Sequence, residues 1–152
     1  MSKKCFLCHF LMNIEKNNAE SAVDVLIVAI PETAGSALYG MIDVLSSAGN
    51  LWQTLVRSRD EQKLFRVRVV SPDDRPFTCG NGIPVHPNVG LDSNPIAPVI
   101  ILPEIWLGPD ESIRGRYPAL IEWIKNCYRM GCLLYTSPSP RDAHESRMPS
   151  SA

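Results

Sequence analysis

From Val23 onward the chain alternates between short apolar runs and amphipathic stretches. The run Val23–Ile30 is almost continuously apolar and rich in β-branched residues, which is typical of a parallel strand buried on both faces. Pro31–Gly35 breaks the run, and the pattern predicts a helix with Ser36 as its N-cap and Gly49 at its end. The apolar stripe of this helix comprises Leu38, Met41, Ile42, Leu45 and Ala48.

The middle of the chain is predicted to contain strands and one hairpin. Phe65–Ser71 at first alternates apolar and basic residues, as a strand near a sheet edge would. Phe77–Cys79 and Ile83–Val85 flank Gly80-Asn81-Gly82, and Asn-Gly between apolar residues is a strong signal for a β-hairpin. The stretch Val89–Pro95 is predicted to be a loop.

A second strand–helix–strand unit follows. Pro98–Leu102 reads as a short buried strand, Pro118 fits the first turn of a helix, and Gly131 fits its C-terminal cap. The apolar stripe of that helix comprises Leu120, Trp123, Ile124 and Cys127. Met130–Leu134 would begin the next strand. This alternation predicts an α/β fold with a mostly parallel sheet and helices on both faces.

Composition narrows the class of protein. A length of 152 residues favours one domain. The net charge of -1 gives no general attraction to nucleic acid or to acidic membranes. No apolar run approaches the roughly 20 residues that span a bilayer, so we predict no membrane partner. Five scattered cysteines, an odd number, favour a reducing cytoplasm over a disulfide framework.

The two ends of the chain are expected to lie outside the domain. Residues 1–22 read as a flexible extension; Cys5–His9 matches the C-x-x-C-H pattern for haem attachment, but no cleavable signal peptide accompanies it, and no cofactor is predicted. Tyr135–Ala152 has no hydrophobic period, resembles a translated sequencing adapter, and is expected to be disordered. Residues 23–134 would then form a partial domain, incomplete at its C-terminus.

Three residues are candidates for ligand binding. In parallel α/β sheets, ligands bind beyond the carboxyl ends of the strands. Glu32 follows the first predicted strand, and Glu104 and Trp106 follow the strand at Pro98–Leu102. The alternatives are a solvated loop carboxylate for Glu32 and simple packing for Trp106. No catalytic residue and no metal ligand is predicted.

Several stretches together resemble a known superfamily: Val25–Glu32, Ser36–Leu45, Phe65–Ser71, Gly82–Pro87 and Trp106–Tyr128. Their order and spacing resemble the class I glutamine amidotransferase-like superfamily in its PfpI-type branch. Within that branch the chain looks most like the N-terminal sensor domain of AraC-type transcriptional regulators. The resemblance implies a flavodoxin-like three-layer sandwich.

The resemblance also bears on catalysis. Enzymes of the superfamily carry a cysteine at a sharp turn after the strand that begins near Gly131, and here that position falls near Pro138. Active relatives commonly place a glycine where Glu104 stands, so that backbone amides can stabilise an oxyanion. A carboxylate at that edge argues against acyl transfer. The question of an enzyme stays open, with the sequence leaning against one.

The function expected from the resemblance is that of a sensor. The chain would be a fragment of the ligand-sensing and dimerisation domain of an AraC-type regulator. Its partners would be a small-molecule effector, a second copy in the parent protein, and DNA only through a missing C-terminal domain. The alternative is a truncated cysteine-dependent hydrolase, hydratase or amidase of the same superfamily.

Overall fold

The computed structural model describes residues 22–56 and 62–137. The helices are α2 (Gly35–Ser47), α3 (Leu51–Leu55), η1 (Gly80–Gly82), η2 (Leu91–Ser93) and α4 (Pro118–Arg129). The strands are β1 (Val23–Val28), β2 (Phe65–Ser71), β3 (Phe77–Cys79), β4 (Ile83–Val85), β5 (Val89–Gly90), β6 (Val99–Leu102) and β7 (Leu133–Thr136). The Cys5–His9 motif, nearly all of the expected extension and residues 138–152 lie outside the described ranges.

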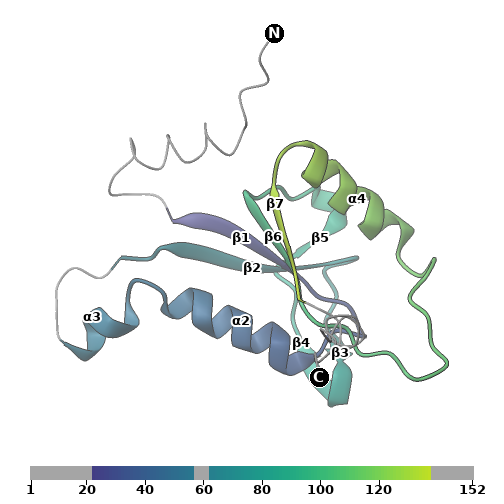
Figure 1. Cartoon of the computed structure of the whole chain (residues 1–152), viewed down its shortest axis with the longest axis horizontal. Helices are drawn as coiled ribbons and strands as arrows, with labels where there is room; N and C mark the ends of the chain where they lie inside the picture. The colour runs from purple at the N-terminus through teal and green to yellow at the C-terminus, as the bar shows by residue number, and fades with distance from the viewer. Residues whose placement is uncertain (1–21, 57–61, 138–152) are drawn as a thin grey trace, which may run out of the picture.

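Five strands form one parallel sheet in the order β5-β2-β1-β6-β7. β1 lies at its centre, where Val25 is opposite Val67 on β2 and opposite Val99 on β6. Helices α2 and α4 lie on opposite sides of this sheet (Figure 1). The predicted α/β fold with a mostly parallel sheet is therefore confirmed, and β2 lies near an edge as expected.

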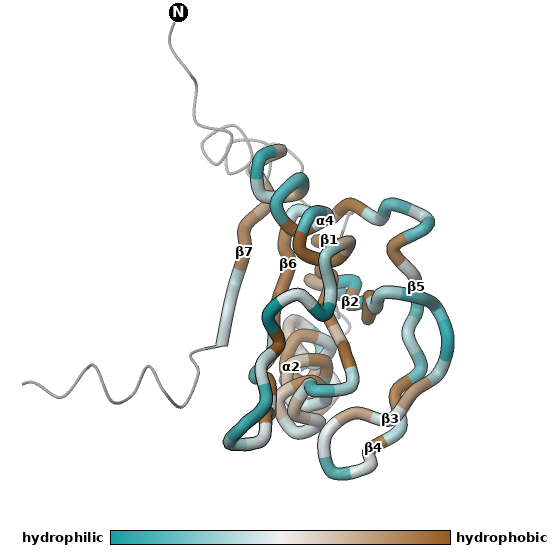
Figure 2. Tube along the Cα trace, turned by 90° about the vertical axis from the view of Figure 1, so that its right-hand side faces the viewer, coloured by the Kyte–Doolittle hydropathy of each residue, from teal (hydrophilic) through white to brown (hydrophobic). Residues whose placement is uncertain are grey.

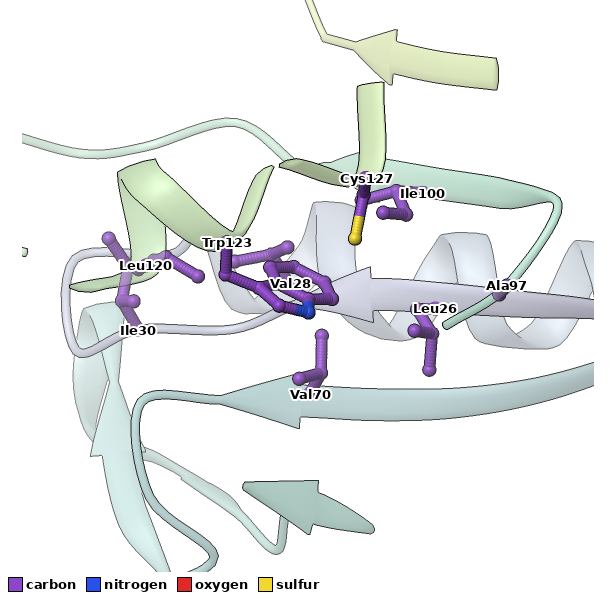
Figure 3. Close-up of a cluster of buried hydrophobic side chains, with 9 residues drawn as sticks. All are labelled: Leu26, Val28, Ile30, Val70, Ala97, Ile100, Leu120, Trp123 and Cys127. Carbon is purple, nitrogen blue, oxygen red and sulfur yellow. The ribbon is translucent and has the colours of Figure 1, made fainter. Parts of the chain in front are cut away.

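Alternate residues of the central strand, β1, belong to two separate apolar clusters, one on each face of the sheet. Leu26 and Val28 face α4, whereas Val25 and Ile27 face α2. On the α4 side, Leu120, Trp123 and Cys127 point from the helix toward the sheet, and they are shown in Figure 3 together with Leu26, Val28, Ile30, Val70, Ala97 and Ile100. A strand that is apolar on both faces can be buried only between two layers, which explains the continuous run at Val23–Ile30.

The predicted hairpin is present as β3 and β4, with Thr78 opposite Pro84. Its turn needs left-handed backbone at Asn81 (φ 61°) and Gly82 (φ 72°), which those two residue types adopt readily. The prediction of a loop throughout Val89–Pro95 is wrong, because Val89–Gly90 forms β5 and pairs with the end of β2. Asn88 holds this segment against β2, since its Oδ1 accepts a 2.7 Å hydrogen bond from the N–H of Val69 and its own N–H donates to the carbonyl oxygen of Val69 at 2.8 Å.

The start of α2 also differs from the prediction. The N-cap is Ala34, with no side-chain capping bond, and Ser36 already lies in the first turn. The N–H of Ala34 itself donates to the carbonyl oxygen of Glu104 at 2.8 Å, which holds the start of the helix against the loop after β6. β1 is two residues shorter than predicted, because the N–H of Ile30 turns away from the sheet to the hydroxyl of Thr33 at 2.9 Å.

The predicted C-terminal cap of α4 is confirmed as a Schellman motif. Gly131 N–H donates to Tyr128 O at 3.0 Å, Cys132 N–H donates to Cys127 O at 3.2 Å, and Gly131 has a φ of 95°. β7 follows and runs two residues past Leu134, the predicted end of the domain. Those two residues, Tyr135 and Thr136, pair with β6, so the sheet includes residues that we assigned to the tail. Figure 2 shows β7 and β5 at opposite edges of the sheet.

Candidate functional site

Two loops meet at the carboxyl ends of β1 and β6. Thr33 and Ile105 form an antiparallel bridge between them. Trp106 N–H donates to the carbonyl oxygen of Glu32 at 2.7 Å, and the bond from Ala34 to Glu104 flanks the bridge on the other side. The predicted residues Glu32, Glu104 and Trp106 are thus brought onto two adjacent backbone segments. None of the helices in the described ranges is long and apolar enough to cross a bilayer.

The carboxylate of Glu32 is held by two side chains from a distant part of the chain. Its Oε1 lies 2.6 Å from Nη1 of Arg116, and its Oε2 accepts a 2.7 Å hydrogen bond from the hydroxyl of Tyr117. The Glu32 side chain is only 12% exposed. These bonds tie the end of β1 to the residues directly before α4, which helps to fix the long connection between β6 and α4.

The protonation states of these groups follow from the same contacts. Burial by itself would raise the pKa of Glu32, but hydrogen bonds from Tyr117 and Arg116 outweigh it and hold that pKa below its ordinary value. Burial and the hydrogen bond to Glu32 raise the pKa of Tyr117 to about 12. The hydrogen bond to Glu32 raises the pKa of Arg116. At neutral pH the site therefore holds a carboxylate, a phenol and a guanidinium.

The other two predicted residues lie on the outside of this junction. Trp106 is 48% exposed, beside Gly80, where a Cβ atom would lie 3.8 Å from the Trp106 ring. Gly80 N–H donates to Thr33 O at 3.0 Å, so the hairpin also contacts the β1 turn. The side chain of Glu104 is half-buried. A ligand-binding role for Glu32, Glu104 and Trp106 stays a prediction.

An apolar cavity of about 210 Å³ lies behind the junction, between the strand ends and α4. It is lined by Val28, Ile30, Thr33, Leu102, Pro103, Ile105, Ile113, Arg114, Tyr117, Leu120, Ile121 and Ile124. A larger hollow of about 370 Å³ lies near the C-terminal end of α2, but its wall is mostly polar. We place the candidate site at the smaller cavity, because it occupies the strand ends where parallel sheets bind ligands.

Sequence reasoning missed Arg114, Arg116 and Tyr117. All three lie in a connection without hydrophobic periodicity. Arg116 and Tyr117 act through contacts with Glu32 across 84 and 85 residues of sequence, whereas Arg114 lines the cavity. The sequence did offer one sign of their role, namely two arginines and a tyrosine directly before Pro118, which starts α4. Such a cluster at a helix start can reach the strand ends on the same side of a sheet.

The cysteines of the described ranges are poorly suited to nucleophilic chemistry. Burial raises the pKa of Cys79 and Cys132, and it raises the pKa of Cys127 to about 11. The Cys132 thiol donates to the carbonyl oxygen of Cys127 at 2.8 Å. A thiol reacts as its thiolate, so the raised pKa values disfavour nucleophilic chemistry at these three groups. Within residues 22–56 and 62–137, no group of three or more potential metal ligands comes together.

Comparison with known proteins gives matches in structure only. No protein-family model matches the sequence, and no curated protein matches it. A structure from Vibrio parahaemolyticus, described as a candidate transcriptional regulator protein, matches with a TM-score of 0.56 and 22% identity over 76% of this chain and 56% of that chain.

A second match is the structure of an AraC family transcriptional regulator from Pseudomonas putida. It has a TM-score of 0.51 and 15% identity, over 75% of this chain and 63% of that chain. The chain thus spans less than two thirds of the length of either protein. The likeness shows that this chain has the α/β fold of the matched parts of these two structures.

Proposed function

We propose that this chain forms part of the ligand-sensing domain of a cytoplasmic AraC-type transcriptional regulator. Two observations support the proposal: the fold is similar to parts of two structures described as regulators, and an apolar cavity lies at the carboxyl ends of its parallel strands. The cavity carries the argument, because small-molecule sites are concave and mostly apolar.

The wall of the cavity offers a way to transmit binding. Ile105, Ile113 and Tyr117 all belong to the connection between β6 and α4, and Glu32 anchors that connection at Tyr117. An effector that contacts one arrangement of the connection better than another shifts the population toward it. Glu104 and Trp106, on the outer side, would carry this shift to an effector contact or to a second copy of the domain.

The described thiols offer no support for the enzyme alternative. Cys79 and Cys127 are buried, Cys132 is partly buried, and all three have raised pKa values. Among the described residues that line the cavity, only Thr33 and Tyr117 carry a hydroxyl, and none carries a thiol. Thr33 accepts a backbone hydrogen bond, and Tyr117 donates to Glu32, so each hydroxyl has a structural partner. A sensing role therefore fits the site better than acyl transfer.

The test is to amplify the source DNA across the codons for Gly131 to Tyr135 and to sequence downstream. We expect the reading frame to continue through a turn and further sheet elements into two helix-turn-helix units that read DNA. A frame that carries a cysteine at the turn, a later histidine and no DNA-binding region would instead establish the enzyme alternative. A genome that encodes Tyr135–Ala152 as printed would overturn both readings.

A further inference from the structure

The outer edge of β7 has no neighbouring strand among the described residues. β7 is the last strand in the order β5-β2-β1-β6-β7, and Figure 2 shows it at one edge of the sheet. The N–H groups of Leu133 and Ser137 both donate to backbone carbonyl oxygens on the β6 side, at 2.8 and 3.0 Å. Because alternate residues of a parallel strand bond to the same neighbour, the N–H and C=O groups of Leu134 and Thr136 point away from β6.

β7 carries none of the features that usually protect a strand edge. Such features are charged side chains, prolines, bulges and very short strands. The stretch Met130–Ser137 contains no charged residue and no proline, and β7 pairs with β6 without a bulge. On the other side of the sheet, β5 has only two residues, and the part of β2 beyond it carries Arg66 and Arg68, which would repel a second copy of that strand. Of the edges in the described sheet, that of β7 is therefore best suited to pairing.

The side chains of β7 add an apolar surface on one face. Leu134 packs against the cluster beneath α4, so Leu133 and Tyr135 face the opposite side of the sheet. These two side chains are 56% and 50% exposed. Exposed apolar side chains next to unpaired backbone groups favour a partner that supplies both a strand and apolar contacts.

A second copy of β7 meets these requirements when the two strands run antiparallel. If Tyr135 lies opposite its counterpart at a two-fold axis, Leu134 of each copy lies opposite Thr136 of the other. The outward N–H and C=O groups of these two residues then bond to each other across the axis. Tyr135 takes the non-hydrogen-bonded position, where opposing Cα atoms lie about 4.5 Å apart and side chains contact. No like charges meet, because the strand has no charged residue.

We propose that β7 is a dimerisation strand, through which two copies of this chain pair antiparallel around a two-fold axis at Tyr135. Both copies use the same surface, so the assembly closes at two. Thr136, at the carboxyl end of β7, pairs with Leu102, which leads into the loop that carries Glu104 and Trp106. The contact therefore lies beside the junction at the strand ends. The proposal concerns the chain of 152 residues and does not rest on the regulator function.

Disulfide trapping tests the register. Cys5, Cys8 and Cys132 are first replaced with serine, which leaves only buried thiols. In this background, oxidised glutathione should convert Tyr135→Cys into a disulfide-linked dimer, because a Cα separation of about 4.5 Å can be bridged. Leu133→Cys is the matched control with similar exposure. The proposed register places its two copies about 13 Å apart along the strands, too far for a disulfide. Equal trapping of both variants, or no trapping of Tyr135→Cys, would overturn the proposal.

Sedimentation velocity tests the backbone pairing without added thiols. The unmodified chain should show a concentration-dependent equilibrium between monomer and dimer. Thr136→Pro removes one outward N–H from each copy, at an edge position that tolerates proline, and should weaken the dimer about tenfold. Thr136→Val keeps the N–H and should change the dissociation constant less than about twofold. Circular dichroism checks that each variant is folded.

Two other outcomes would also contradict the dimer. One is an unchanged dissociation constant for folded Thr136→Pro. The other is an unmodified chain that stays monomeric; if the amides of Leu134 and Thr136 are then protected from hydrogen exchange, another segment of the same chain covers the edge. The regulator proposal is tested separately, on the source DNA. Trapping at Tyr135 without a DNA-binding region in the gene would retain the dimer and remove the regulator, and the reverse result would do the opposite.

Discussion

Replacing Tyr117 with phenylalanine tests the anchor between β1 and the connection that precedes α4. The substitution keeps the ring that lines the cavity and removes only the hydroxyl that donates to Glu32 at 2.7 Å. A hydrogen bond to a charged group contributes about 1.5–3 kcal/mol. Because Tyr117 is half-buried, we expect the free energy of unfolding to fall by about 1.5 kcal/mol, near the lower end of that range.

The assay is urea unfolding followed by tryptophan fluorescence on four proteins: the wild type, Tyr117→Phe, Glu32→Ala and the double variant. If the hydroxyl acts through Glu32, the sum of the stability losses of the two single variants will exceed the loss of the double variant by about 1–1.5 kcal/mol. Tyr128→Phe is the matched control, because Tyr128 is exposed on α4, and it should have almost no effect. A coupling energy below about 0.5 kcal/mol would refute the anchor.

The same variants have a predicted pH dependence. The pKa of Glu32 is lower in the folded chain than the ordinary value of 4.5, so the folded chain binds fewer protons in that interval. The stability that Glu32 contributes is therefore complete above pH 4.5 and is lost as the pH falls through the folded pKa. Tyr117 has the opposite sign: its contribution is complete below pH 10 and is lost as the pH rises toward about 12. Wild type and Glu32→Ala should converge in stability at low pH.

Three further predictions concern stability and association. Trp123→Phe removes the donor of a buried 3.0 Å hydrogen bond to Pro95 O and should lower the free energy of unfolding by about 1–3 kcal/mol, measured by urea titration against a buried apolar control. Gly49→Ala should cost more than Gly115→Ala in thermal unfolding, because both have positive φ but only at Gly49 would the new Cβ lie 2.5 Å from a backbone carbonyl oxygen; equal melting temperatures would contradict this. β7 is an edge strand, so we expect the chain to self-associate through it. Tyr135→Lys places a charge on this strand and should reduce self-association in analytical ultracentrifugation, whereas unchanged sedimentation would argue against pairing through that edge.

The sequence predicted the elements whose residues carry a strong periodic signal. The two-sided apolar run of β1 and the stripe of α4 both follow directly from burial, and the positive φ at Gly131 follows from its place after the helix. β5 was not predictable in this way, because a two-residue strand has no period and depends on the side chain of Asn88. The helix start at Gly35 was missed for a similar reason, since its N-cap residue, Ala34, has no capping side chain and is held by a backbone bond to Glu104.

The junction of the two loops at the strand ends was predictable, but the cavity beside it was not, and none of the three predicted residues lines that cavity. The expectation that ligands bind beyond the carboxyl ends of parallel strands led to the junction at Glu32 and Glu104, because neighbouring parallel strands end at the same edge of the sheet. It could not identify Tyr117 as the partner of Glu32, because that pairing depends on how a connection without periodicity folds back over β1. Nor could it reveal the cavity, which exists only once α4 is placed against the strand ends.

The central place of β1 has a consequence for synthesis on the ribosome. β1 is the first strand of the described sheet to be made, yet its two neighbours begin only at Phe65 and Val99. Until Leu102 has been synthesised, the nascent chain cannot complete the middle of the sheet. β1 therefore lacks one or both of its neighbours until residues far along the chain have been made. Such long-range pairing slows folding and leaves apolar surface exposed. We therefore expect chaperones that bind short apolar segments to bind Val25–Val28 before β6 has been made.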